Sequence, residues 1–236
     1  MPSIMITGAN RGLGLEFARQ YAADGWQIFA ACRNPEAADA LRKLAQAGSV
    51  TIFPMDVSDP HSVKRAAANL GNTAIDILLN SAGIIGKQNQ KTGNVDYESW
   101  KDVLNVNTMG PLRVTEAFSD HVARSERKLV VTITSGMGSL ADNTSGGSIP
   151  YRSSKAAVNM VMRSAILLRA ASLASSSIRA GSKPIWVARA RRSRQRIAWQ
   201  PSKASLRRLD WLSPESSFIT MVANMLGEAS RHRPRF

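Results

Sequence analysis

Tyr151 and Lys155 form the clearest catalytic pattern in the sequence, within the stretch "YRSSK". Residues four apart lie on one face of a helix, so the lysine ammonium is expected beside the phenol. An adjacent positive charge favours the phenolate form, and a tyrosine in such a setting can serve as a general acid or base. Pairs with this spacing are common by chance and are usually structural. This pair opens a helical pattern directly after a strand-like run, which favours a catalytic role.

A glycine-rich turn lies near the start of the chain, where "TGANRGLG" (7–14) follows a short apolar run and opens a helical pattern. Gly8 permits a tight turn, Gly12 lets the backbone approach a pyrophosphate, and Gly14 permits close packing of helix on strand. The N-terminus of that helix offers free N–H groups to phosphates. The spacing G-x-x-x-G-x-G is by itself compatible with a plain structural turn. Its place between strand and helix favours a dinucleotide-binding site.

The second strand-like run ends in Cys32 and Arg33, where an NAD-selective site would present an acidic residue. Arg33 and Arg11 supply two guanidinium groups that suit the 2′-phosphate of NADP. NADP is therefore the predicted cofactor and NAD the alternative, while a competing interpretation makes both arginines ordinary surface residues. Cys32 is the only cysteine, so no intrachain disulfide can form, and it is expected to be a small buried apolar residue. No metal site is expected.

The elements that would position these residues alternate along the first two thirds of the chain. Strand-like runs are expected at 3–7, 27–31, 50–57, 76–83 and 128–135, and helices at 13–23, 35–47, from 60 onward, 97–125 and 151–168. The strand-like runs are almost continuously apolar, as in parallel sheets that are covered by helices on both faces. The pattern predicts a doubly wound, Rossmann-like α/β fold.

Several further motifs accompany these two, namely "MDV" (55–57), "NSAG" (80–83), "NVNTMGP" (105–111), "TSGMGS" (134–139) and "YRSSKAAVNM" (151–160). With these motifs, residues 1–164 resemble the short-chain dehydrogenase/reductase family, nearest its C-factor and sniffer-like carbonyl reductases. The resemblance implies an NADP-dependent oxidoreductase that transfers a hydride between nicotinamide and a carbonyl or alcohol substrate.

The same resemblance implies a catalytic set of Asn107, Ser135, Tyr151 and Lys155. Tyr151 would protonate the developing alkoxide, Ser135 would hydrogen-bond the carbonyl oxygen, Lys155 would hold the ribose, and Asn107 would position a water that relays the proton. Ser135 precedes Tyr151 by sixteen residues, three more than is common in the family, because the loop containing "ADNTSGG" is longer. Ser139 is therefore the competing serine.

The cofactor would contact residues from each of these motifs. The resemblance places Asp56 and Val57 at the adenine ring. The other expected cofactor contacts are Gly8, Asn10, Arg11, Gly12, Leu13, Gly14, Arg33, Asn80, Ala82, Gly83, Tyr151 and Lys155.

The formal net charge of +14 is concentrated in the last third of the chain. Residues 1–164 hold 17 basic and 14 acidic residues, whereas residues 165–236 hold 14 and 3. The family's sixth strand, its Pro-Gly turn with the threonine for nicotinamide, and its seventh strand are not recognisable after residue 164. We therefore divide the chain into a Rossmann domain (1–164), which binds NADP and carries the catalytic residues, and an anomalous basic segment (165–236), and expect the last strands to be missing or irregular.

The genetic code offers an explanation for this basic segment. The stretch "SIRAGSKPIWVAR" (177–189) can be encoded by codons whose frame, displaced by one base, reads "HPGWVQTDMGGP". That hidden reading contains the family's Pro-Gly turn and its threonine. The hypothesis is a frameshift near residue 165, which would make the arginine-rich run an out-of-frame product rather than a nucleic-acid-binding arm.

The expected partners are a small carbonyl or alcohol substrate and, as an open option, a second copy of the chain. The sequence contains no apolar run near 20 residues, so a membrane span is not expected and a cytoplasmic location is. Two alternative functions stay open: a dinucleotide-binding remnant without catalysis and, less favoured, a basic protein that binds nucleic acid.

Overall fold

A single parallel sheet forms the centre of the molecule. The computed structural model describes the backbone of residues 1–176 and the side chains of residues 1–165. The strands of the sheet are β1 (Ser3–Thr7), β2 (Gln27–Cys32), β3 (Val50–Pro54), β4 (Ile77–Asn80) and β5 (Leu129–Thr132). Their order is β3-β2-β1-β4-β5, and every pair is parallel. The order reverses between β1 and β4, as expected for the predicted doubly wound fold, which is confirmed.

Three strands end earlier than the apolar runs predict. The runs at 50–57, 76–83 and 128–135 pair with their neighbours only as far as residues 54, 80 and 132. The residues that follow each strand leave the ladder and form loops at the carboxyl edge of the sheet. Met55 and Val57 extend the apolar run after β3 because they are buried at that edge, without strand pairing.

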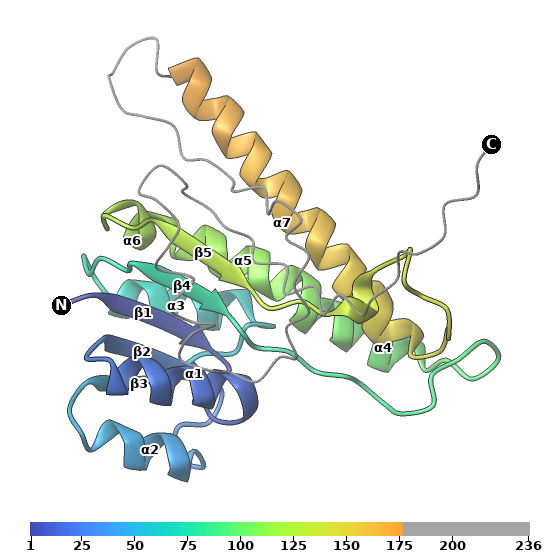
Figure 1. Cartoon of the computed structure of the whole chain (residues 1–236), viewed down its shortest axis with the longest axis horizontal. Helices are drawn as coiled ribbons and strands as arrows, with labels where there is room; N and C mark the ends of the chain where they lie inside the picture. The colour runs from blue at the N-terminus through green and yellow to red at the C-terminus, as the bar shows by residue number, and fades with distance from the viewer. Residues whose placement is uncertain (177–236) are drawn as a thin grey trace, which may run out of the picture.

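Helices cover both faces of the sheet (Figure 1). The helices α1 (Gly12–Ala23) and α2 (Asp39–Ala45) lie on one face, and α3 (Pro60–Asn69), α5 (Gly110–Ala117), α6 (Ser119–Ala123) and the first turns of α7 (Ile149–Ser176) lie on the other. The Asp59 side chain caps α3 by accepting a hydrogen bond from the His61 N–H, and Pro60 begins that helix, as predicted.

Alternate strand residues point into two separate cores. Ile4 and Ile6 of β1 pack with Tyr21 and Leu41 beneath α1 and α2. Met5, which lies between them in the sequence, packs with Phe118 on the opposite face. The two-residue period of the strand therefore divides one apolar run between two cores.

The stretch 97–125, predicted as one helix, consists of several shorter pieces. A π-helical turn, η1 (Asn105–Met109), separates α4 (Tyr97–Leu104) from α5, and α6 follows α5 after a single residue. Pro111 lies in the first turn of α5 and has no N–H to donate, so a regular ladder cannot continue through this point. The widened turn contains Asn107, in keeping with the tendency of π-helical turns to occur at functional sites.

The last helix is longer than its predicted range of 151–168. It begins at Ile149 and continues to Ser176, through residues rich in alanine and leucine, which favour helix. Residue 165, where the predicted basic segment starts, therefore lies inside α7. The expectation that the last strands are missing or irregular concerns residues 177–236, which lie outside the described part of the chain. In the part that is described, no helix is long and apolar enough to cross a membrane.

Candidate active site

The glycine turn between β1 and α1 is shaped by backbone contacts. Gly8 and Gly12 have φ angles of 67° and 57°, in the left-handed region that favours glycine. A Cβ built on Gly14 would lie 2.3 Å from the Gly8 carbonyl oxygen, so no side chain fits there. A Cβ built on Gly8 would lie 2.8 Å from the Ala82 Cα, which shows how closely the turn approaches the loop after β4. This bare, tightly folded backbone fits a bound pyrophosphate.

Thr7, at the end of β1, joins the glycine turn to the β4 loop. Its hydroxyl oxygen accepts hydrogen bonds from the N–H groups of Ser81 (3.1 Å) and Ala82 (3.0 Å). The sequence analysis did not select Thr7, although its position directly before Gly8 is a usable signal. The threonine fixes two of the loops that would enclose the cofactor.

The glycine turn and the residue after β2 carry exposed side chains, two of them basic. Asn10, Arg11, Leu13 and Arg33 all have exposed side chains at the carboxyl edge of β1 and β2. Cys32 is buried, which raises the pKa of its thiol, and this confirms the expected small buried residue. The two arginines are therefore free of the core and available to a ligand.

Asp56 and Val57 are held in fixed positions after β3. The Asp56 Oδ1 atom accepts hydrogen bonds from the Ser58 N–H (2.9 Å) and hydroxyl (2.6 Å). The buried Val57 packs against Gly110 and accepts a hydrogen bond from Arg113 through its carbonyl oxygen. Both residues lie on the loop that leaves the carboxyl end of β3.

Asn80 ends β4 inside the protein. Its Nδ2 donates to the hydroxyl oxygens of Thr115 (3.2 Å) and Thr132 (3.3 Å). These bonds tie β4 to β5 and to α5. Asn80 is therefore a buried link at the carboxyl end of β4, and Ala82 and Gly83 follow it on the loop that leaves the strand.

Lys155 is the most heavily buried ionisable group of the expected catalytic set. Only 5 % of the residue is exposed, and burial lowers the pKa of its ammonium to about 8. The Nζ atom donates to the Ile133 carbonyl oxygen (3.0 Å) and lies 5.7 Å from the centre of the Tyr151 ring. The predicted pair on one helix face is thus present, with the ammonium beside the aromatic ring.

Asn107 joins the π-helical turn to the β4 loop and to α7. It is fully buried, its Oδ1 accepts from the Ile84 N–H (2.8 Å), and its Nδ2 donates to the Ile84 carbonyl (2.8 Å) and to the Ser154 hydroxyl (3.0 Å). Its side-chain amide is therefore engaged by the protein itself. Ser154 was not selected from the sequence, but its spacing of three from Tyr151 on a helix could have identified it.

Ser135 and Ser139 occupy different parts of the connection from β5 to α7. The Ser135 hydroxyl oxygen accepts a hydrogen bond from the Met137 N–H (3.2 Å). Ser135 follows Ile133, whose carbonyl binds Lys155, by two residues. The Ser139 hydroxyl oxygen accepts from the Asp142 N–H (3.2 Å) in the exposed loop. Gly138 lies between them, pressed against the Lys155 backbone.

Gly83 lies close to two of the expected catalytic residues, Asn107 and Lys155. A Cβ built on Gly83 would lie 3.4 Å from Asn107 Oδ1 and 3.8 Å from Lys155 Nζ. Tyr151 precedes Lys155 by one helical turn, and Ser135 follows the strand whose end binds the lysine. Two chain segments almost fifty residues apart are thereby brought to one edge of the sheet.

Comparison with known proteins agrees with this geometry. The family model for short chain dehydrogenase matches residues 2–182. The chain is 37 % identical over 164 residues to 1-hydroxy-2-glutathionyl-2-methyl-3-butene dehydrogenase of Rhodococcus sp. (strain AD45), covering 68 % of each chain. It is 43 % identical over 98 residues to the C-signal protein of Myxococcus xanthus, covering 42 % of this chain and 58 % of that protein.

Among solved structures, a carbonyl reductase from Pseudomonas aeruginosa PAO1 in complex with NADP superposes with a TM-score of 0.64. It is 35 % identical, and the match covers 70 % of this chain and 74 % of that one. The chain belongs to the short-chain dehydrogenase family.

Proposed function

We propose that this protein reduces small aldehydes or ketones, and oxidises the corresponding alcohols, with NADP(H) as the hydride carrier. The observation that carries the proposal is the burial of Lys155 beside Tyr151 at the carboxyl edge of the sheet. The buried ammonium donates one hydrogen bond within the described part of the chain, to the Ile133 carbonyl, and an ammonium has three donors, so it keeps donor capacity for a ribose hydroxyl. The ammonium lies 5.7 Å from the centre of the Tyr151 ring, and a tyrosine held in such a site can transfer a proton to a bound substrate.

Each expected catalytic residue has a defined task in this proposal. Tyr151 delivers its proton to the carbonyl oxygen as negative charge develops there, and Ser135 donates a hydrogen bond to the same oxygen. Lys155 holds the ribose and places its positive charge beside Tyr151. Because both Nδ2 hydrogens of Asn107 are engaged with Ile84 and Ser154, a water that this residue orders would be held by the second acceptor position of Oδ1 or by the main chain. The nicotinamide, when bound, supplies the hydride.

NADP is the proposed cofactor because Arg11 and Arg33 are exposed at the ends of β1 and β2 and no carboxylate follows β2 directly. The two guanidinium groups can bind the 2′-phosphate through charge-assisted hydrogen bonds. Support also comes from the carbonyl reductase of P. aeruginosa, which was crystallised with NADP.

The test is NADPH oxidation with a panel of aldehydes and ketones. Tyr151→Phe removes the proton donor and should lower the rate by roughly 100-fold or more. Tyr97→Phe is the matched control, because Tyr97 is exposed on α4 and its ring stacks on Trp100 without help from the hydroxyl. If Tyr151→Phe and Tyr97→Phe are equally active, Tyr151 is not the acid.

We further propose that residues from about 165 onward are translated out of frame, as the hidden "HPGWVQTDMGGP" reading indicates. The coding DNA should then contain an open frame, displaced by one base, through the Pro-Gly turn; stop codons in that frame before the turn would contradict this. The restored protein should bind NADPH more tightly and turn over faster, because a misplacement of about 1 Å can cost on the order of 100-fold in rate.

A further inference from the structure

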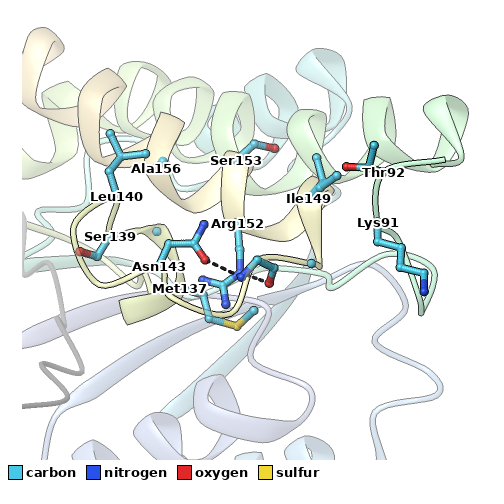
Figure 2. Close-up of a pocket in the computed structure, with 13 residues that line it drawn as sticks. Lys91, Thr92, Met137, Ser139, Leu140, Asn143, Ile149, Arg152, Ser153 and Ala156 are labelled. Carbon is cyan, nitrogen blue, oxygen red and sulfur yellow. Dashed lines mark hydrogen bonds between the residues drawn. The ribbon is translucent and has the colours of Figure 1, made fainter. Parts of the chain in front are cut away.

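The Arg152 side chain joins the distal part of the loop between β5 and α7 to the first turn of the helix. Arg152 directly follows Tyr151 on α7, and its Nε donates to the Gly146 carbonyl (3.0 Å) while its NH2 group donates to the Ser145 hydroxyl (2.8 Å). In Figure 2 the arginine extends from the helix toward the loop segment that carries Asn143. A forked guanidinium can hold two acceptors in fixed directions, which a lysine cannot.

The backbone of this loop needs such a support. Gly146, Gly147 and Ser148 have φ angles of 62°, 66° and 45°, so three successive residues are left-handed. The third is not a glycine, and a side chain in this region is strained. Within the loop, the Asn143 Oδ1 accepts from the Gly146 N–H (3.0 Å), and the helix start is tied to the β4 loop by the Ile149 N–H and the Gln90 carbonyl (3.1 Å).

Loop and helix together enclose an open hollow of about 490 Å³. The α7 residues that line it are Ile149, Arg152, Ser153 and Ala156, which share one helix face. Tyr151 and Lys155 belong to the same first turns of α7 but lie about 130° around the helix axis from that face. Met137 and Leu140 supply further apolar surface from the loop (Figure 2). Leu140 is 88 % exposed, which leaves a large apolar side chain without cover at the rim.

The hollow begins close to the reacting groups. Met137, one of its lining residues, donates its N–H to Ser135, and the neighbouring Gly138 lies against Lys155. Arg152 and Ser153 directly follow Tyr151. Its volume lies within the range of small-molecule sites, about 300–1,000 Å³.

We propose that Arg152 is a positioning residue for the substrate: it holds residues 139–147 as the outer wall of this hollow, which receives the apolar, non-reacting part of the carbonyl compound. The proposal rests on the proposed carbonyl reduction. Arg152 contacts neither the carbonyl group nor the cofactor in this account, and it acts through the loop. Loss of the guanidinium frees the strained residues 146–148 and opens the wall.

The first experiment measures binding without turnover. Hexan-1-ol and octan-1-ol are titrated into the cofactor-free chain by saturation-transfer NMR. Two more buried methylene groups should tighten binding by about sixteenfold, at roughly fourfold for each. Arg152→Ala should bring this ratio near one, Arg152→Lys should restore it in part, and Arg163→Ala, an exposed arginine on the same helix, should leave it unchanged. Thermal unfolding of each variant checks that it is folded.

The second experiment separates positioning from general damage. Arg152→Ala should raise KM for octanal about tenfold and lower kcat less than twofold, whereas a disrupted fold would reduce kcat as strongly. The proposal is overturned if Arg152→Ala binds octan-1-ol as tightly as the parent chain does. It is also overturned if the parent chain binds octan-1-ol and hexan-1-ol with the same affinity. The alcohols could bind with the expected dependence on chain length and on Arg152 although the chain does not oxidise NADPH. In that case the proposed reaction is wrong, but the role of Arg152 in shaping an apolar ligand site is confirmed.

Discussion

Around the glycine turn the backbone defines the shape of the site, whereas around Tyr151 and Lys155 buried side chains define it. Gly8 and Gly14 leave no room for a Cβ, and the nearby Arg11 and Arg33 are exposed. At the other end, Asn107 and Lys155 are buried and already hydrogen-bonded to Ile84, Ser154 and Ile133. The proposed nucleotide end is therefore a tightly packed backbone turn with two exposed arginines nearby, and the proposed catalytic end is a set of buried, hydrogen-bonded side chains.

Gly14→Ala should have the largest effect of the substitutions considered, because it disturbs the close backbone packing of the glycine turn. The new Cβ would lie 2.3 Å from the Gly8 carbonyl, with backbone on both sides, so we expect a loss of roughly 3–5 kcal/mol in the free energy of unfolding. Gly25→Ala is the control, since Gly25 has a φ of 80° but open space around it, and it should cost only about 1 kcal/mol. Urea unfolding measures both; equal losses would show that close packing at Gly14 does not matter.

The side-chain end is tested by the pH dependence of stability. Burial lowers the pKa of Lys155 to about 8, whereas in the unfolded chain the group keeps its proton up to its ordinary value of 10.5. The folded state therefore binds fewer protons in this window, and the free energy of unfolding should rise by about 3 kcal/mol as pH increases from 8 to 10.5. Below pH 8 the contribution is constant.

Lys155→Met should remove that rise, and Lys64→Met, at an exposed position on α3, should keep it. Urea unfolding between pH 7 and 10.5 gives the three curves. A parallel course for the parent chain and Lys155→Met would mean that the ammonium is not desolvated in solution.

The exposed charges of the nucleotide end should give the smallest effect. Arg33→Asp replaces a phosphate partner with a repelling carboxylate and should weaken NADPH binding by about 10- to 100-fold, while NADH binding is kept or improved. Fluorescence titration with both cofactors measures the change, with Arg163→Asp as the control on α7. If the preference between the two cofactors does not change, Arg33 is a bystander.

Features that depend on local sequence could be predicted, and those that depend on distant contacts could not. The glycine turn, the order of strands and helices and the Tyr151–Lys155 pair follow from residue type and spacing. The ends of β3, β4 and β5 depend on where neighbouring strands stop. The π-helical turn at Asn107 depends on Pro111 and on contacts with Ile84 and Ser154, which lie 23 and 47 residues away from Asn107 in the chain.

The role of Arg152 lies between these two cases. Its position beside Tyr151 is visible in "YRSSK", but its partners Ser145 and Gly146 lie in a loop whose left-handed backbone the sequence does not announce. Ser148, in particular, is not a residue type that predicts a positive φ.

Transfer of deuterium from labelled NADPH tests the central claim most directly. The chain is incubated with benzaldehyde and NADPH that carries deuterium at the reactive C4 position, and the benzyl alcohol formed is analysed by mass spectrometry. Our account predicts one deuterium on the former carbonyl carbon, formed at least 100-fold more slowly by Tyr151→Phe. Benzyl alcohol without deuterium, or equal incorporation by the parent chain and Tyr151→Phe, would contradict it.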